Sequence, residues 1–574
     1  MTSEQSYPPL RMPDHLFAEL ATGGGSPDAL AFLERGERAR RLPLLRTALA
    51  HITAVPSPLG PPMEAWRVLK AAADRAPDQV ERLLLAPQTG GWLAHLLRRV
   101  HDTASGPPLW AEAGFLHVLA VTAALHAEME THLLVPLVDG ALNLPSLGLV
   151  RLLGDSRGLS VGRARTKSGE LELTSREGDS SSDCRPHTLA AQTSETPSDT
   201  VGVSGPGSTY WVPLRTLTHT GPSGTTAIPL DDLGPYRDLD EPIAPDRLDP
   251  DEAAAWQELF DEAAGILAAH CAPGPGRLDP ARIRAIVPWG RTSATPPAPP
   301  VVRLSASSGD SFGSMVITRP ATGLALAETL VHEFQHSKLA ALFHLFPLLD
   351  DDREERYYAP WRSDPRHLAG LLHGAYAFTG VAGFWRDRMA DPQCADIAAY
   401  YFALRRTQTR LVVRTLLTSG RLTAPGRRLV TGLARTLDDW LHEPVDPGAL
   451  ARARTAAALH RTEWRLRNAV PPREPGTGYG DSAPLCFRTD RRPWPDLRTH
   501  AFALRPAAPR TADEHLAAGD PATALAGYTD ALARDPGEPH VLAGWIVARA
   551  ALEPGRITRR MLARPELLQL RSHG

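Results

Sequence analysis

The sequence predicts a mainly helical α+β protein, and three observations carry this prediction. Apolar residues recur at helical spacing along most of the chain, β-prone runs concentrate in its middle, and one apolar helical run contains His332-Glu333-Phe334-Gln335-His336. At 574 residues, the chain is long enough for several domains and at least one large core. The expected parts are a helical N-terminal bundle, a β-rich insert, a helical metal-binding core and a helical tail.

Residues 1–135 are expected to form the N-terminal bundle, because apolar residues recur on one helical face and proline–glycine breaks at 56–62 and 106–108 separate the helices. Residues 136–235 predict a β-rich module, since short β-prone runs lie there among Ser, Thr, Gly and Pro. Within it, the polar stretch 176–208 is expected to be a flexible insert.

Residues 236–470 are expected to form the metal-binding domain. Asp249-Pro250 predicts the start of a helix over 251–270, with an acidic cap and proline in the first turn. Strands are expected before the motif helix and long helices after it, at these positions: strands 283–289, 301–305 and 314–318, and helices 365–389, 395–417, 426–441 and 448–468.

The last part of the chain predicts a connector and a helical tail. Residues 471–510 are rich in proline and are expected to be an irregular connector. Residues 511–574 look like one tetratricopeptide-type (TPR-like) helical hairpin, because Gly519-Asp520-Pro521 separates two apolar-periodic runs. A lone repeat of this kind either docks a partner protein or caps the packing of the domain.

Charge and cysteine content narrow the class of protein. The 62 Lys+Arg nearly balance the 65 Asp+Glu, so no strong field points to nucleic acid or to a membrane surface. The four cysteines are far apart and form no CxxC pair, which is typical of a reducing compartment. The first residues lack a signal-peptide pattern, and no apolar run is expected to reach membrane-spanning length. We therefore expect a cytoplasmic protein without nucleic-acid or membrane partners.

The HExxH motif predicts a metal site. On a helix, His332 and His336 lie about 40° apart and one turn apart, so both imidazoles project from one face. This suits two-point coordination of a divalent metal, with Glu333 beside them as a base or a supporting group. A chance match on an ordinary helix is the alternative. It is disfavoured because burying two histidines and a glutamate in an apolar run is costly without a partner.

The third ligand decides the class of metal site. A metzincin is excluded, because Leu339 and Leu342 stand where glycine and histidine would be needed. His344 lies roughly 12 Å along the same helix from His336, which is too far to share an ion. Glu354 and Glu355 have spacings that a gluzincin-like peptidase tolerates, yet they sit in a charged run typical of a solvated turn.

His373 is the favoured third ligand, in a helix expected to open with Asp364 as cap and Pro365 in its first turn. Small residues on the same face would let this helix approach the motif helix closely. The alternative is a core histidine bonded to a backbone carbonyl. Three neutral nitrogens would leave coordination positions open for water, oxygen or a bidentate co-substrate.

Four further residues near the motif are assigned from helical geometry. Glu328 lies one turn before His332, where it could orient the His332 imidazole. The alternative is an ordinary surface glutamate. Lys338 is rotated about 200° from His336 and is expected at the surface. Arg366, two turns before His373, is the candidate for binding a carboxylate, and Arg362 is the fallback. An ordinary salt bridge to the acidic turn is the alternative for both arginines.

These residues resemble those of a known family, the HExxH-motif proteins encoded beside ribosomally made peptide natural products and described as α-ketoglutarate-dependent peptide β-hydroxylases. The resemblance rests on three segments, LAETLVHEFQH (326–336), PWRSDPR (360–366) and GLLHGAY (370–376), with a weaker similarity over 12–46. The β-rich module and the tail carry little of it.

The resemblance implies Fe(II) bound by His332, His336 and His373, with α-ketoglutarate and O2 as co-substrates. The expected reaction is β-hydroxylation of a residue in a precursor peptide, and other peptide-maturation enzymes are further expected partners. In this reading Glu333 orients a ligand or a bound water. Two other hypotheses stay open: a zinc metallopeptidase with Glu354 or Glu355 as third ligand and Glu333 as base, and a non-catalytic docking protein.

Overall fold

The computed structural model describes residues 10–152, 157–176, 201–203, 210–222, 224–239, 241–270, 272–290, 304–470, 486–490 and 493–571. The chain divides into two compact units. Unit 1 comprises Met1–Ala29, Ala272–Arg277 and Phe346–Gly574, and unit 2 comprises Leu30–Cys271 and Leu278–Leu345. The boundary at Phe346 cuts through the segment 236–470 that the sequence indicated as one metal-binding domain. Most of the predicted insert 176–208 lies outside the described residues, as do residues 301–303 of the second predicted strand.

Unit 2 contains most of the predicted N-terminal helices. Their bounds are α2 (Pro27–Ile52), α3 (Pro62–Arg75), α4 (Pro77–Leu85), α5 (Pro87–Val100), α6 (Leu109–Ala113) and α7 (Phe115–His126). Four of them begin with proline, whose fixed φ and missing N–H suit the first helical position. The breaks at 56–62 and 106–108 fall between helices as predicted. The helical region ends before residue 135, because Thr131 begins a strand whose alternate residues are buried.

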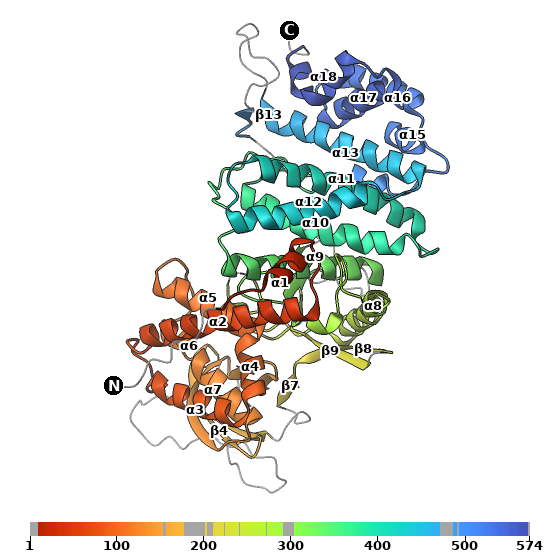
Figure 1. Ribbon diagram of the computed structural model, residues 1–574. Coiled ribbons are helices and arrows are strands. Elements are labelled where there is room, and N and C mark those ends of the chain that lie inside the picture. Colours follow the sequence, from red (N-terminus) through yellow and green to blue (C-terminus); the bar gives the residue numbers. More distant parts are fainter. Residues whose placement is uncertain are drawn as a thin grey trace. The chain divides into compact units, whose positions relative to one another are not determined.

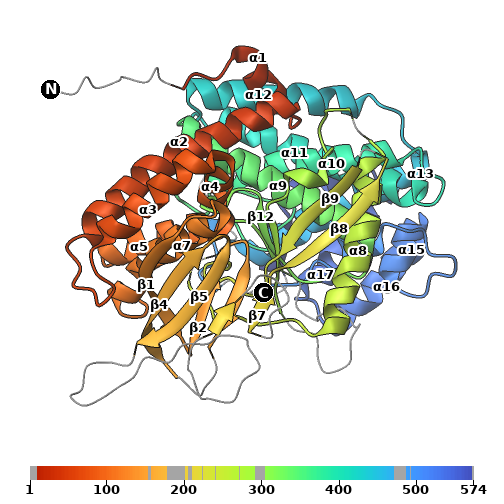
Figure 2. The same cartoon turned by 90° about the horizontal axis from the view of Figure 1, so that it is seen from below.

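A seven-stranded antiparallel sheet follows these helices in unit 2, with strand order β6-β5-β4-β1-β2-β3-β7. Its strands are β1 (Thr131–Val138), β2 (Ala141–Leu144), β3 (Gly148–Arg151), β4 (Leu159–Lys167), β5 (Glu170–Arg176), β6 (Val201–Val203) and β7 (Trp211–Pro213). Helix α7 packs on this sheet, and Figure 2 shows α3 and α7 beside β1 and β4. The stretch Leu109–His126 is long and apolar enough to cross a membrane, contrary to the sequence expectation, but 83% of it is buried within the protein.

A second sheet has five strands in the order β11-β12-β10-β9-β8, and the motif helix packs against it. Its strands are β8 (Arg215–Gly221), β9 (Gly224–Leu230), β10 (Ala285–Pro288), β11 (Ser305–Ala306) and β12 (Ser314–Ile317). Strands β9, β10 and β12 are parallel, and the edge strands β8 and β11 are antiparallel to their neighbours. The strands of the β-rich module predicted over 136–235 are shared between the two sheets, since β8 and β9 belong to the second one.

Two helices pack together beside this sheet. Helix α8 (Pro250–Ala268) begins as predicted, with the Asp249 carboxylate accepting a hydrogen bond from the Glu252 amide at 2.8 Å. Helix α9 (Gly323–Leu345) contains the HExxH motif and packs against α8 and β12. Figure 2 shows α8 next to β8 and β9. A short 3-10 helix, η1 (Pro280–Arg282), precedes β10.

Unit 1 is built mainly from four long helices close to their predicted bounds: α10 (Leu368–Arg388), α11 (Ala395–Thr418), α12 (Ala424–Leu441) and α13 (Pro447–Asn468). Helix α11 packs against the other three, α1 (Asp14–Ala21) packs against α12, and Figure 1 shows α10 to α13 as successive helices. Gly276, with a φ of +79°, lies against α10, where a Cβ would stand 2.1 Å from the Phe384 amide nitrogen. This close approach of the loop to α10 requires glycine.

The tail of unit 1 is helical, as predicted, and the connector contains little regular structure among its described residues. The remaining elements are β13 (Ala469–Val470), β14 (Cys486–Phe487), α14 (Arg498–Ala501), α15 (Ala512–Ala518), α16 (Pro521–Arg534), α17 (Pro539–Leu552), α18 (Arg556–Ala563) and the 3-10 helix η2 (Pro565–Arg571). Gly519 ends α15 in the left-handed conformation, and Asp520 caps α16, which gives the turn expected between these two helices.

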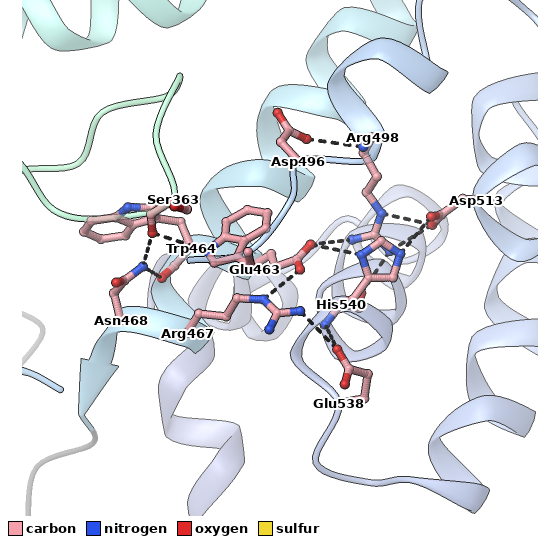
Figure 3. A network of polar contacts seen from close by, with 11 residues as sticks. Ser363, Glu463, Trp464, Arg467, Asn468, Asp496, Arg498, Asp513, Glu538 and His540 are labelled. Atoms are coloured by element: carbon pink, nitrogen blue, oxygen red, sulfur yellow. Dashed lines mark hydrogen bonds and ion pairs between the residues drawn. The ribbon is translucent and has the colours of Figure 1, made fainter. Parts of the chain in front are cut away.

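A buried ionic network joins the tail to α13 (Figure 3). The Arg498 guanidinium donates to Asp513 Oδ1 at 2.8 and 3.0 Å and to Glu463 Oε2 at 3.2 Å. His540 lies between the same two carboxylates, with Nδ1 3.2 Å from Glu463 Oε2 and Nε2 2.9 Å from Asp513 Oδ2. At the C-terminal end, the buried Glu566 accepts from Arg465 at 2.7 and 3.0 Å and from Arg564 at 2.7 Å. The tail is thus anchored by charged pairs as well as by apolar contacts.

The network predicts a loss of stability in mildly alkaline solution. Burial lowers the pKa of His540, but the hydrogen bonds with Asp513 and Glu463 outweigh it and raise the pKa to about 9. A raised histidine pKa contributes stability that is complete below about pH 6.5 and is lost as the pH rises through 9. We expect the free energy of unfolding to fall by roughly 1–3 kcal/mol between pH 6.5 and 9.5. Urea unfolding of the native protein and of His540→Gln, which should lack most of this fall, checks it.

Candidate metal centre

The structure brings the two motif histidines of α9 together, as the sequence predicts. The Nε2 atoms of His332 and His336 lie 3.1 Å apart, and both imidazoles are half-buried. They lie one turn apart because α9 continues through the motif without interruption. The two ring nitrogens therefore converge on one point at the helix surface, as two-point coordination of an ion requires.

Glu333 lies beside this pair in a buried position. Its side chain is 1% exposed, and its Oε1 atom is 4.0 Å from His332 Nε2. The Ser307 hydroxyl, just beyond β11, donates to the other carboxylate oxygen at 3.0 Å. Burial raises the pKa of Glu333, and the hydrogen bonds from Ser305 and Ser307 only partly offset that rise. The carboxyl group is thus held by hydroxyl donors and shielded from solvent, as a group that exchanges a proton with a bound molecule would be.

Sequence reasoning missed the two serines that hold Glu333. Ser305 and Ser307 are two residues apart in an extended segment, which places both side chains on one face of the strand. That spacing, just before the motif helix in the chain, is the signal that would have identified them. The rest of loop 307–313 is also fixed on α9: the Gly313 amide donates to Ser337 Oγ at 3.2 Å, and the Phe312 ring contacts Phe334 edge-on.

We expect the contact between Ser307 and Glu333 to be energetically coupled. Ser307→Ala removes a donor from a buried carboxylate, a loss that costs about 1–3 kcal/mol. In a double-mutant cycle with Glu333→Gln, urea unfolding should give a coupling free energy of about 1 kcal/mol or more. Additive effects of the two substitutions would mean that the hydroxyl does not support the carboxylate.

The sequence also assigned positions to Glu328 and Lys338 on α9. Glu328 is half-buried one turn before His332, and its assigned role in orienting the imidazole stays a prediction. Lys338 was expected at the surface, and that prediction is wrong: it is 5% exposed, and burial lowers the pKa of its ammonium to about 7. The angular argument failed because α9 is buried on more than one face, with Ser337 and Leu339 also covered.

His373 belongs to α10, in unit 1. Its imidazole is half-buried, and burial lowers its pKa to about 4, with the charge of His367 adding to the effect. A histidine with this pKa is neutral at pH 7, as a metal ligand must be. Its neighbour Gly374 lies under Trp361, whose ring atom Cζ2 would be 2.1 Å from a Cβ at that position. That His373 joins His332 and His336 stays a prediction.

The predicted start of the His373 helix is wrong. Asp364 and Pro365 precede the helix rather than opening it, and α10 begins at Leu368 after His367. Asp351 replaces the expected cap: its carboxylate accepts from the Ala369 amide at 3.3 Å and lies 2.5 Å from His367 Nδ1. The sequence pattern misled because the residue that satisfies the first turn comes from a loop 18 positions earlier.

This correction changes the position of the two candidate arginines. Arg366 is not on the helix but pairs with Tyr357 in an isolated β-bridge, so the argument that it shares a helical face with His373 fails. Its Nε lies 3.5 Å from Asp364 Oδ2, and Arg362 Nε lies 3.1 Å from Asp364 Oδ1. Both arginines therefore form a salt bridge, but their partner is Asp364 and not the acidic turn at 350–356 that was the alternative. A carboxylate ligand would have to compete with Asp364.

The other candidate ligands behave as ordinary polar residues. Glu354 and Glu355 are exposed, and Glu354 forms an ion pair with Arg356, as expected for a solvated turn. His344 Nδ1 lies 2.7 Å from the Oε1 atom of the buried Glu37, so its ring is used within unit 2. Its exclusion as a ligand agrees with this pairing.

The pair of histidines fits a divalent metal. Two nitrogens held about 2.1 Å from one ion lie roughly 3.0 Å apart at a right angle and roughly 3.4 Å apart in a tetrahedron. The observed 3.1 Å is close to the right-angle value. Among the described residues, no group of three or more His, Cys, Asp or Glu side chains is assembled for an ion. Within the described part of unit 2, the side chains placed to hold an ion are therefore the two histidines of α9.

Comparisons with known proteins do not assign a function to the chain. No protein-family model matches the chain, and no curated protein matches its sequence.

Proposed function

We propose that the chain is an Fe(II)/α-ketoglutarate-dependent dioxygenase that β-hydroxylates a residue of a ribosomally synthesised precursor peptide in the cytoplasm. The observation that carries this proposal is the convergence of His332 and His336, with Nε2 atoms 3.1 Å apart beside a buried carboxyl group. The resemblance of segments 326–336, 360–366 and 370–376 to the peptide β-hydroxylases selects iron and this reaction class.

The donor set suits an iron that keeps open positions. His332 and His336 would hold the metal, and His373, neutral at pH 7, would be the third nitrogen ligand. Fe(II) with α-ketoglutarate and O2 supplies the oxidising power to hydroxylate a carbon that has no acidic proton, while α-ketoglutarate becomes succinate and CO2. Arg366, or Arg362, would bind the distal carboxylate of α-ketoglutarate in place of Asp364.

Glu333 and its serines have a supporting part in this proposal. The carboxyl group is too buried to reach bulk solvent, and Ser307 holds one oxygen while the other lies 4.0 Å from His332 Nε2. The His332 nitrogen that Glu333 faces is the one that would bind the metal, so in this position Glu333 would accept a hydrogen bond from a water or another ligand beside the ion. Glu328 would orient an imidazole from the preceding turn.

Anaerobic reconstitution tests the proposal directly. Protein loaded with Fe(II) and α-ketoglutarate should develop the weak visible charge-transfer band of a bidentate chelate. Oxygen and the precursor peptide should then yield succinate and a peptide heavier by one oxygen atom, followed by mass spectrometry. If no succinate forms with any metal, even in the presence of the peptide, the proposal is wrong.

A zinc metallopeptidase is the second candidate, favoured by the burial of Glu333 beside His332, where a general base would activate water. It predicts tight zinc, cleaved peptide products and loss of nearly all cleavage in Glu333→Gln. A hydroxylase should retain part of its succinate formation in the same variant. A docking protein, the third reading, predicts stoichiometric metal with no open coordination position and no turnover.

A further inference from the structure

A cavity of about 240 Å³ in unit 2 lies where the three parallel strands β9, β10 and β12 end. Its wall includes a residue within two positions of each strand end: Asp232, Trp289 and Arg319. The start of α8 adds Glu252 and Trp256. Small molecules bind outside the carboxyl ends of parallel strands in many open sheets. Neither motif histidine lines this cavity, so it is a second candidate site.

Backbone hydrogen bonds hold the strand ends that form this wall. The Asp231 amide, next to Asp232, donates to the Ile286 carbonyl of β10 at 2.8 Å. The Trp289 amide donates to the Ile317 carbonyl of β12 at 3.0 Å. The wall is therefore built on strands that are bonded to one another, which keeps its side chains in place before any ligand arrives.

Glu252 is a wall residue whose hydrogen bonds are incomplete. It is 8% exposed, and its Oε1 atom accepts from Arg319 Nε at 2.7 Å. Its other oxygen, Oε2, is buried and accepts no hydrogen bond within the described structure. A buried carboxylate oxygen without a donor is costly, and such atoms are rare in folded proteins. Because Glu252 lines the cavity, a molecule that presents an N–H group there would satisfy it.

The charged groups of the wall have both signs, so the position of the unsatisfied acceptor selects the ligand and a net charge does not. Asp232 is paired with Arg215 and Arg247 at 3.3 and 3.0 Å. Arg237 donates to two backbone carbonyls at 2.7 and 2.8 Å, and the charge of Asp232 acts on it. These groups already have partners within the protein, whereas Glu252 Oε2 has none.

Two tryptophans give the cavity an aromatic surface. Trp256 is 1% exposed, but Trp289 is 37% exposed, which is unusually open for so large an apolar side chain. Leu248 and Pro288 extend the apolar part of the wall. The face of an indole attracts a positively charged group and packs against a flat carbon skeleton. The cavity therefore combines one unsatisfied acceptor with a surface suited to an organic cation.

We propose that this cavity binds a small organic amine, whose ammonium group donates to Glu252 and whose carbon skeleton packs on Trp289. The amine is either a free molecule or the lysine side chain of a peptide, since both present the same group. This inference depends neither on the metal that the histidines hold nor on the proposed reaction.

Isothermal titration of the full chain tests the site with benzylamine, with Nα-acetyl-lysine amide and with benzyl methyl ether, which has no donor. At least one amine should bind about tenfold more tightly than the ether, and the tighter of the two amines identifies the source. Glu252→Gln keeps an oxygen for Arg319 and turns an N–H donor toward the ligand. It should weaken amine binding by about tenfold, which corresponds to 1.4 kcal/mol.

Glu258→Gln is the matched control, since Glu258 is an exposed glutamate of α8 that does not line the cavity. It should leave the affinity unchanged within about twofold. Trp289→Ala should weaken benzylamine binding by about fivefold through loss of the indole face. Melting curves confirm that each variant is folded. The proposal is overturned if neither amine binds, if the ether binds as tightly, or if Glu252→Gln and Glu258→Gln bind alike.

Discussion

Replacing His332 or His336 by alanine should lower the affinity for Fe(II) by at least about 100-fold and abolish succinate formation. Mutating a residue that only supports a metal ligand lowers metal affinity by about 10–100-fold. These substitutions would instead remove one of the two nitrogens, which lie 3.1 Å apart. Anaerobic Fe(II) or Co(II) titration measures the affinity without depending on turnover. Each variant should keep the helical circular dichroism of the native protein.

His344→Ala is the matched control on the same helix. Its imidazole is paired with Glu37, so the affinity for metal should be unchanged although one histidine of α9 has been removed. His373→Ala then tests the predicted third ligand and should also weaken metal binding. Metal affinity that is insensitive to both His332→Ala and His336→Ala would remove the basis of every enzymatic proposal made for this chain.

Arg498→Ala should destabilise the tail of unit 1 by about 3–5 kcal/mol, because it removes a buried guanidinium that pairs with both Glu463 and Asp513 and leaves His540 as the cation between them. Arg498 is 2% exposed and contacts two carboxylates and the carbonyl of His540. Hydrogen exchange should show faster opening of α15 and α17, while α9 remains protected.

The control for this prediction is Arg549→Ala, which removes an exposed arginine from α17. Arg549 pairs with Glu553 one turn later, and exposed pairs of this kind contribute little to stability. We expect no measurable change in urea unfolding. Equal effects of the two substitutions would mean that the network in Figure 3 does not anchor the tail.

The sequence predicts those parts of the fold that local rules determine. The start of α8 follows from the Asp249 side chain and the proline after it, and the convergence of His332 and His336 follows from helical spacing. Both depend on residues within one or two turns of each other. The long helices α10 to α13 follow in the same way from apolar periodicity, to within a few residues at their ends.

The parts that sequence reasoning missed depend on contacts between distant segments. Ser307 meets Glu333 across 26 residues, Asp351 rather than Asp364 supports the first turn of α10, and the Arg41 side chain reaches the Asp310 carbonyl across 269 residues. Lys338 was misplaced for the same reason, since its burial depends on what packs on the far side of α9. The spacing of apolar residues shows which residues share a helix face, but it does not show how many faces other elements pack against.

Glu566 has a consequence for shortening the protein. It is fully buried in η2 and forms ion pairs with two arginines, Arg465 of α13 and Arg564. Deletion of the last helices would therefore strip α13 of its counter-charge and uncover apolar side chains such as Leu466, so the shortened protein should aggregate. Affinity handles are better attached at the other terminus, and a partner that binds the tail must use its outer surface rather than pull it away.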